Sequence, residues 1–147
     1  MKKSMHRPIK WIFVVLWLLG LPGGAGAAEL VIIANPDLPG PSLDVKGLQR
    51  IYMGKLTRWS NDEAIVPAML KTGPVHDAFV ESYLERSVHR FVTYWRQMVF
   101  TGKGLPPRSF ASERELIAFV AITPGSVGYA SAEADTQDVK VLSVSRN

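Results

Sequence analysis

Ile51-Tyr-Met-Gly-Lys-Leu-Thr-Arg-Trp-Ser60 is the stretch that decides the fold, together with a second block, Thr123-Pro-Gly-Ser-Val-Gly-Tyr129. The first block closes a predicted helix over about 45–53, with Asp44 placed to cap its start and Gly54 placed to end it. In the second block, which follows another helical run, a Pro-Gly pair breaks the helix before a short strand. Each block therefore fixes a helix end, a turn and an aromatic anchor.

Strands and helices alternate through the rest of the chain. An apolar run predicts a buried strand at 30–34, and further strands are expected at 65–70, 127–130 and 139–144. Helical spacing of apolar residues predicts helices over 75–84 and 88–99, with Ser87 placed to cap the second, and Ser112 with Glu115 forms a capping box that starts another. Pro67 indicates an edge position or a bulge for its strand. This order is typical of an α/β layered domain.

The aromatic residues are interpreted mainly as core. Trp95 lies on the apolar stripe of the helix predicted over 88–99, which favours packing over contact with a ligand. Tyr94 lies off that stripe by about one helical step, so we expect it to be an aromatic residue at the surface.

The two blocks, in this order, resemble segments of the substrate-binding proteins of phosphate-type ABC transporters, most closely the short single-domain members. The resemblance runs from about Leu30 to Leu142 and also takes in Tyr94-Trp95 and the stretch 100–104. It implies a single three-layer α/β domain, similar to one lobe of a type II periplasmic binding protein. It also implies phosphate or another oxyanion as ligand and an ABC permease as partner.

The first 28 residues are predicted to be a cleaved signal peptide. Basic residues precede an apolar run, Trp11 to Leu21, that is far shorter than the roughly 20 residues of a membrane span. A run of small residues follows, with cleavage expected after Ala27 or Ala28. Since the chain has no cysteine, neither a disulfide nor a lipid attachment can form. We therefore expect a soluble periplasmic protein, residues 29–147, that is not a lipoprotein.

The formal charge of +4 comes entirely from the predicted signal. That segment holds 4 of the 17 basic residues, and the other 13 equal the 13 acidic residues in number. A neutral domain gives no electrostatic reason to expect nucleic acid as a partner. The length of 29–147 suits one domain with one core, but not the two lobes of a full solute-binding protein.

The candidate site precedes the helix predicted over 75–84. Proteins of the resembled family hold their anion at a helix N-terminus with the pattern Arg-x-x-Gly-Ser-Gly-Thr. This chain offers Lys71, Thr72, Gly73 and His76 there, but it lacks the arginine, and Pro74 removes one amide donor. The anion motif is thus eroded. The same residues would also suffice simply to start a helix, with Gly73 as the turn and Pro74 as the first residue.

Two functions remain open. The first is an oxyanion-binding protein that serves an ABC permease and needs a homodimer, or a partner domain, to rebuild a cleft. The second is a periplasmic sensor or adaptor module that binds a membrane sensor or other protein partner instead of a small anion. We expect no enzyme and no cofactor, because the chain has no cysteine, no metal-ligand spacing and no convincing triad.

Overall fold

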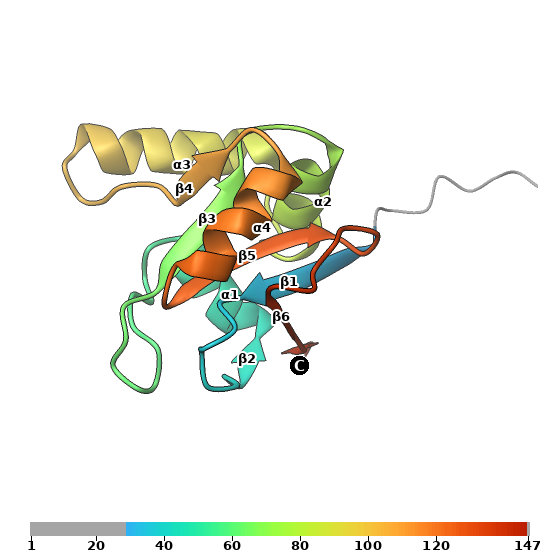
Figure 1. Ribbon diagram of the computed structural model, residues 1–147. Coiled ribbons are helices and arrows are strands. Elements are labelled where there is room, and N and C mark those ends of the chain that lie inside the picture. The colour runs from blue at the N-terminus through green and yellow to red at the C-terminus, as the bar shows by residue number, and fades with distance from the viewer. Residues whose placement is uncertain (1–28, 147) are drawn as a thin grey trace, which may run out of the picture.

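The computed structural model describes residues 29–146, so the predicted signal peptide at 1–28 lies outside the described residues. The strands are β1 (Leu30–Ala34), β2 (Leu43–Asp44), β3 (Val66–Leu70), β4 (Arg108–Phe110), β5 (Ser126–Ser131), β6 (Lys140–Leu142) and β7 (Val144–Ser145). The helices are α1 (Val45–Tyr52), α2 (Pro74–Ser82), α3 (Val88–Phe100) and α4 (Glu113–Ile122). Figure 1 shows their arrangement.

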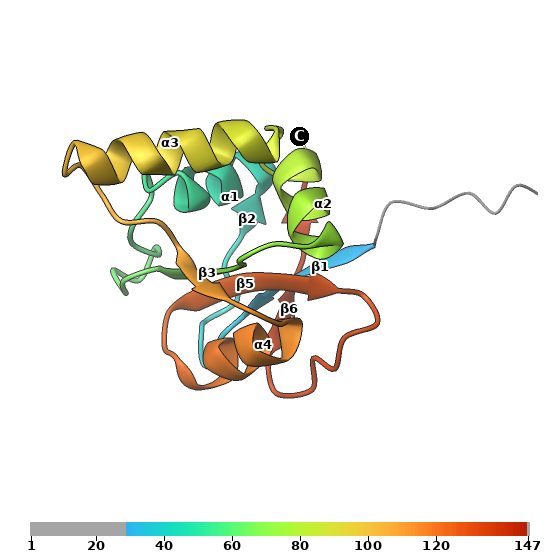
Figure 2. The same cartoon turned by 90° about the horizontal axis from the view of Figure 1, so that it is seen from above.

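The elements form three layers. The middle layer is a five-stranded sheet in the order β4-β3-β5-β1-β6, and β2 pairs separately with β7. Figure 2 shows α4 on one face of the sheet and α1, α2 and α3 on the other. The single α/β domain of three layers expected from the sequence is confirmed.

The sheet is mixed. β3 runs parallel to both β4 and β5, whereas β1 runs antiparallel to β5 and β6. β5 is buried, and its Gly128 allows α4 to pack closely, because a Cβ there would lie 2.7 Å from a methyl carbon of Leu116. Because β3 runs parallel to both β4 and β5, the carboxyl ends of all three strands lie along the same edge of the sheet.

The two blocks that decide the fold meet in space. The indole Nε1–H of Trp59, from the first block, donates to the carbonyl oxygen of Gly125, from the second, at 2.9 Å. Gly125 has φ 73°, and a Cβ there would come within 2.1 Å of the Ala64 carbonyl oxygen. Only glycine fits such a turn, so this contact joins two segments more than 60 residues apart.

The helix ends follow the predicted signals. The carboxylate of Asp44 accepts from the amide of Gly47 at 2.6 Å at the start of α1, and Gly54 follows its end with φ 72°. The side chains of Ser87 and Ser112 accept from backbone amides at the starts of α3 and α4, each at 3.2 Å. These polar side chains satisfy amides that have no partner within the helix.

Two positions differ from the expectation. Of the edge position or bulge expected at Pro67, the edge position is wrong, because Pro67 lies in β3, which β4 and β5 flank. It is tolerated because β4 pairs with β3 only from Ala68 onward, and the amide of Val66 already bonds toward β5. Tyr94 is half-buried instead of a surface aromatic, and its hydroxyl donates to the carbonyl oxygen of Met53 at 2.7 Å.

The short strands are the other point at which the structure differs from what the sequence predicts. The sequence indicates neither β4 nor β2, because each is only two or three residues long. The strand expected over 139–144 is divided into β6 and β7, which belong to different sheets.

Candidate functional site

The connections that follow β3 and β4 leave the sheet in opposite directions. The two strands are parallel neighbours, with Leu70 paired to Phe110 at their ends. The chain leaves β3 into α2 on one face of the sheet, and it leaves β4 into α4 on the opposite face (Figure 2). In open α/β sheets, ligands bind outside the carboxyl ends of strands where the connections part in this way.

The predicted residues Lys71, Thr72 and Gly73 lie at this position, as the connection from β3 to α2. The Lys71 amide donates to the carbonyl oxygen of Phe110 at 2.9 Å, which ties the connection to the end of β4. The side chains of Lys71 and Thr72 are exposed. A Lys ammonium and a Thr hydroxyl are thus available to a ligand at this edge.

The N-terminus of α2 is open. Gly73 is the cap residue, with φ 111° and ψ 169°, and no side chain caps the helix. A Cβ built on Gly73 would meet nothing within 4 Å, so the space beside it is free. Pro74 has no amide hydrogen, and the amides of Val75 and His76 have no partner within the helix. Such an end attracts anions through its free N–H groups and the helix dipole.

The His76 side chain is separated from the other three predicted residues. It is 4% exposed, and its Nδ1 lies 2.6 Å from the hydroxyl oxygen of Tyr129 on β5. That oxygen also accepts the amide hydrogen of Leu70 at 2.9 Å. His76 therefore anchors the α2 start from within the core, through a hydroxyl that also contacts the end of β3.

Burial determines the protonation of this pair. It lowers the pKa of His76 below its usual 6.5, and nearby Asp77 opposes the shift. Burial likewise raises the pKa of Tyr129 well above its usual value, while the hydrogen bond from the Leu70 amide opposes that shift. Both groups are uncharged at neutral pH.

The N-terminus of α4 lies at the same edge and is already occupied. The Ser112 hydroxyl accepts from the Glu115 amide at 3.2 Å, and the Glu115 carboxylate accepts from the Ala111 amide at 3.2 Å. The Glu113 carboxylate accepts from the amide of Ser131 at 2.5 Å. Two carboxylates thus stand where an anion would otherwise bind, and they would repel one.

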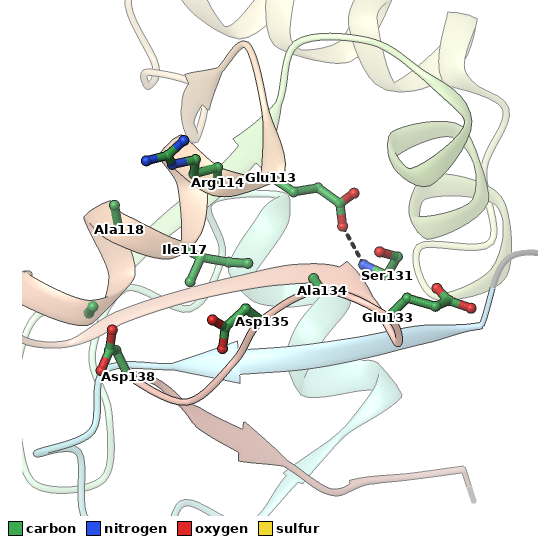
Figure 3. Close-up of a pocket in the computed structure, with 10 residues that line it drawn as sticks. Glu113, Arg114, Ile117, Ala118, Ser131, Glu133, Ala134, Asp135 and Asp138 are labelled. Carbon is green, nitrogen blue, oxygen red and sulfur yellow. Dashed lines mark hydrogen bonds between the residues drawn. The ribbon is translucent and has the colours of Figure 1, made fainter.

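A hollow of about 750 Å³ lies beside α4, between that helix and the segment after β5. Figure 3 shows Glu113, Glu133, Asp135 and Asp138 around it, with Ile117 on its helical side. The sequence analysis missed this hollow, because it depends on how the 131–138 segment folds back over α4. Its acidic lining makes it unsuitable for an oxyanion.

Within residues 29–146, no group of three or more His, Cys, Asp or Glu side chains could hold a metal ion. No helix in the described part of the chain is long and apolar enough to cross a membrane.

The comparisons with known proteins support the fold. No family model matches the sequence, and no curated protein matches it. Among solved structures, an ABC-type phosphate transport receptor from Vibrio cholerae superposes with a TM-score of 0.61 at 20% identity, over 79% of this chain and 46% of the other. PstS from Borrelia burgdorferi gives 0.62 at 17% identity, over 79% and 47%.

A third structure, from Clostridium perfringens and solved with bound phosphate, gives a TM-score of 0.62 at 19% identity, over 79% of this chain and 44% of the other. The fold is therefore that of phosphate-type substrate-binding proteins, and the resemblance seen in the sequence is confirmed at the level of the fold. The chain spans less than half the length of these three proteins.

Proposed function

We propose that this protein is an exported, periplasmic solute-binding-like protein that takes up phosphate or a similar oxyanion at the N-terminus of α2. The observation that carries the proposal is the open helix end at the point where the β3 and β4 connections part, beside Lys71 and Thr72. The shared fold with proteins named for phosphate transport supports the same ligand class. A cleaved signal at 1–28 would deliver the protein to the periplasm.

The proposed contacts are few. The Val75 and His76 amides and the Thr72 hydroxyl would donate to the anion oxygens, and the Lys71 ammonium would supply the charge. No arginine fork grips the anion here, and Pro74 offers no amide, so binding is expected to be weaker than in a site with both. The role is binding and not catalysis.

The edge is also open to solvent on one side. A two-lobed protein encloses its ligand between lobes, and this chain has the length of less than half of such a protein. We therefore infer that a second surface completes the cleft. It would come from a second copy of the chain, a partner domain or the ABC permease that receives the anion.

The alternative proposal is a sensor or adaptor module. The same open edge supports it, since a lobe with a weak anion motif can present a surface to a membrane sensor protein without enclosing any ligand. The two proposals differ in whether a small oxyanion binds with saturation.

The two proposals can be distinguished by calorimetric titration of the purified protein with phosphate, sulfate and molybdate. Light scattering gives the mass of the protein in the same samples. The binding-protein proposal predicts saturable heat that the double variant Lys71→Ala/Thr72→Ala abolishes. The matched control Lys103→Ala/Thr57→Ala alters exposed residues away from α2 and should bind as the wild type does. Absence of heat with every oxyanion would contradict the proposal and favour the sensor or adaptor.

A further inference from the structure

A second hollow, about 580 Å³ in volume, lies between α1 and the turn that joins α2 to α3. Five cationic side chains from three parts of the fold line it: Lys46, Arg50, Lys55, Arg86 and Arg90. Glu85 is the only acidic residue among its lining residues, and no salt bridge within residues 29–146 involves any of the five cations. Because residues 29–146 carry equal numbers of basic and acidic residues, this concentration of positive charge is a local feature.

Hydrogen bonds fix the parts of the chain that carry these cations. The side-chain amide of Gln49 on α1 donates to the carbonyl oxygen of Tyr83 at 3.0 Å, which ties α1 to the end of α2. The amides of Lys55 and Leu56 both donate to the carbonyl oxygen of Arg50, at 2.7 and 3.1 Å. The backbone segments that carry the five exposed cations are therefore held together before any ligand arrives, which reduces the entropy lost on binding.

The turn between α2 and α3 is fixed in a similar way. Glu85 adopts a left-handed conformation with φ 53°, and the Arg86 amide donates to the carbonyl oxygen of Val80 at 3.3 Å. Ser87 then caps α3, with its hydroxyl accepting from the Arg90 amide. This arrangement brings Arg86 and Arg90 to the hollow from either side of the α3 start.

The charge at the α3 start opposes helix stability. Asp and Glu are favoured in the first turn of a helix, yet α3 has no acidic residue there and carries Arg90 instead. Arg50 lies in the last turn of α1, where the helix dipole favours a cation, so its presence alone does not indicate a ligand site. Together with the other four exposed cations around the hollow, Arg90 gives this surface a positive potential suited to a strongly anionic ligand.

We propose that this hollow is a binding site for a compact soluble ligand that carries several phosphate groups, distinct from the oxyanion position at α2. Arginine forks match the paired oxygens of phosphates, and Arg50, Arg86 and Arg90 supply three of them. Five cations around one hollow exceed what a single phosphate neutralises, whereas linked phosphates supply comparable charge. The concave shape favours a ligand that enters the hollow over the flat surface of a membrane.

Titration of the purified protein with inorganic tripolyphosphate in low salt tests the proposal. We expect saturable binding that weakens as salt is added, and at least a tenfold loss of affinity in Arg86→Gln/Arg90→Gln. The control Arg58→Gln/Arg96→Gln removes the same charge from exposed arginines outside the hollow and should change affinity less than twofold. The variant Lys71→Ala/Thr72→Ala should still bind tripolyphosphate, so failure at α2 and failure here are distinguishable.

Four results would overturn the proposal. Absence of binding is the first, and an equal loss in the control variant, which would mean nonspecific attraction, is the second. Citrate binding as tightly as tripolyphosphate would show that phosphate groups are not what is recognised. Binding to phosphatidylglycerol vesicles without binding to tripolyphosphate would assign the cations to a membrane surface instead.

Discussion

Two helices begin at the same edge of the sheet, and their starts are held in opposite ways. α4 begins with the Ser112 hydroxyl bonded to the Glu115 amide and the Glu115 carboxylate bonded to the Ala111 amide just before the helix, so its end is closed by its own side chains. α2 begins at Gly73 and Pro74 with no side-chain cap, and it is held from behind by His76 in the core. A helix end supported from the inside leaves its outer amides free, and this difference is what makes α2 the candidate site.

The support from within can be tested by removing the Tyr129 hydroxyl. Tyr129→Phe keeps the ring that stacks on Phe79 at 3.9 Å but leaves the Leu70 amide and His76 without a partner. We expect a loss of about 3 kcal/mol in the free energy of unfolding, since each unpaired buried group costs about 1–3 kcal/mol. Denaturant unfolding measures it. The control Tyr52→Phe should lose clearly less, because the Ala68 and Val127 carbonyl oxygens share its one donor and each has a second lone pair; equal losses would contradict the account.

The backbone of the α2 start can be tested at Gly73. Gly73→Ala forces a side chain into a conformation with φ 111° that only glycine adopts readily, although the space beside it is open. We expect a loss of about 2 kcal/mol in unfolding free energy from backbone strain. Gly40→Ala is the matched control, since its surroundings are equally open and its φ is not in the positive region, and it should change stability by less than about 0.5 kcal/mol. Similar effects at both sites would remove the argument from backbone strain.

The caps themselves can be compared directly. Ser112→Ala removes the hydroxyl that accepts from the Glu115 amide, and a lost cap costs about 1 kcal/mol. Thr72→Ala, just before α2, should cost less than about 0.5 kcal/mol, because the cap residue there is Gly73 and no side chain caps the helix. Thermal or denaturant unfolding of both variants gives the answer. If Thr72→Ala were the more destabilising, Thr72 would be a structural residue and not a free hydroxyl.

The smallest effect at neutral pH concerns His76. Its folded pKa is below the unfolded value of 6.5, so as pH falls through 6.5 the unfolded chain gains a proton that the folded protein does not. Stability should therefore be flat above about pH 7.5 and fall below it, by at most about 1.4 kcal/mol per pH unit. His76→Gln should flatten this slope between pH 7.5 and 5.5, while Ser112→Ala, which removes no ionisable group, should keep it. If the slope were unchanged in His76→Gln, a group other than His76 would be responsible for the pH dependence of stability.

The sequence predicted the fold where local signals are strong. The caps at Asp44, Ser87 and Ser112 and the breaks at Gly54 and Gly125 each have a local chemical cause, and the structure has them all. It did not predict β4, because a strand of three residues has too little pattern, or the half-buried position of Tyr94, which depends on a carbonyl in another segment.

For the candidate site too, the sequence predicted only the part that local signals determine. The connection at Lys71–Gly73 follows from glycine and proline chemistry, so its place at a helix start could be found locally. The inward orientation of His76 depends on Tyr129, 53 residues further along the chain, and no local pattern indicates it. The contrast with α4 also needed the structure, because the parallel pairing of β3 with β4 is what brings the two helix starts to one edge.

The most direct test of the central claim is to follow the backbone amides by ¹H–¹⁵N NMR while phosphate is added to the purified protein. The account predicts saturable shifts for the amides of Thr72, Gly73, Val75 and His76, with those of Ala111 to Glu115 unchanged. Shifts at the α4 start, or none at α2, would contradict it.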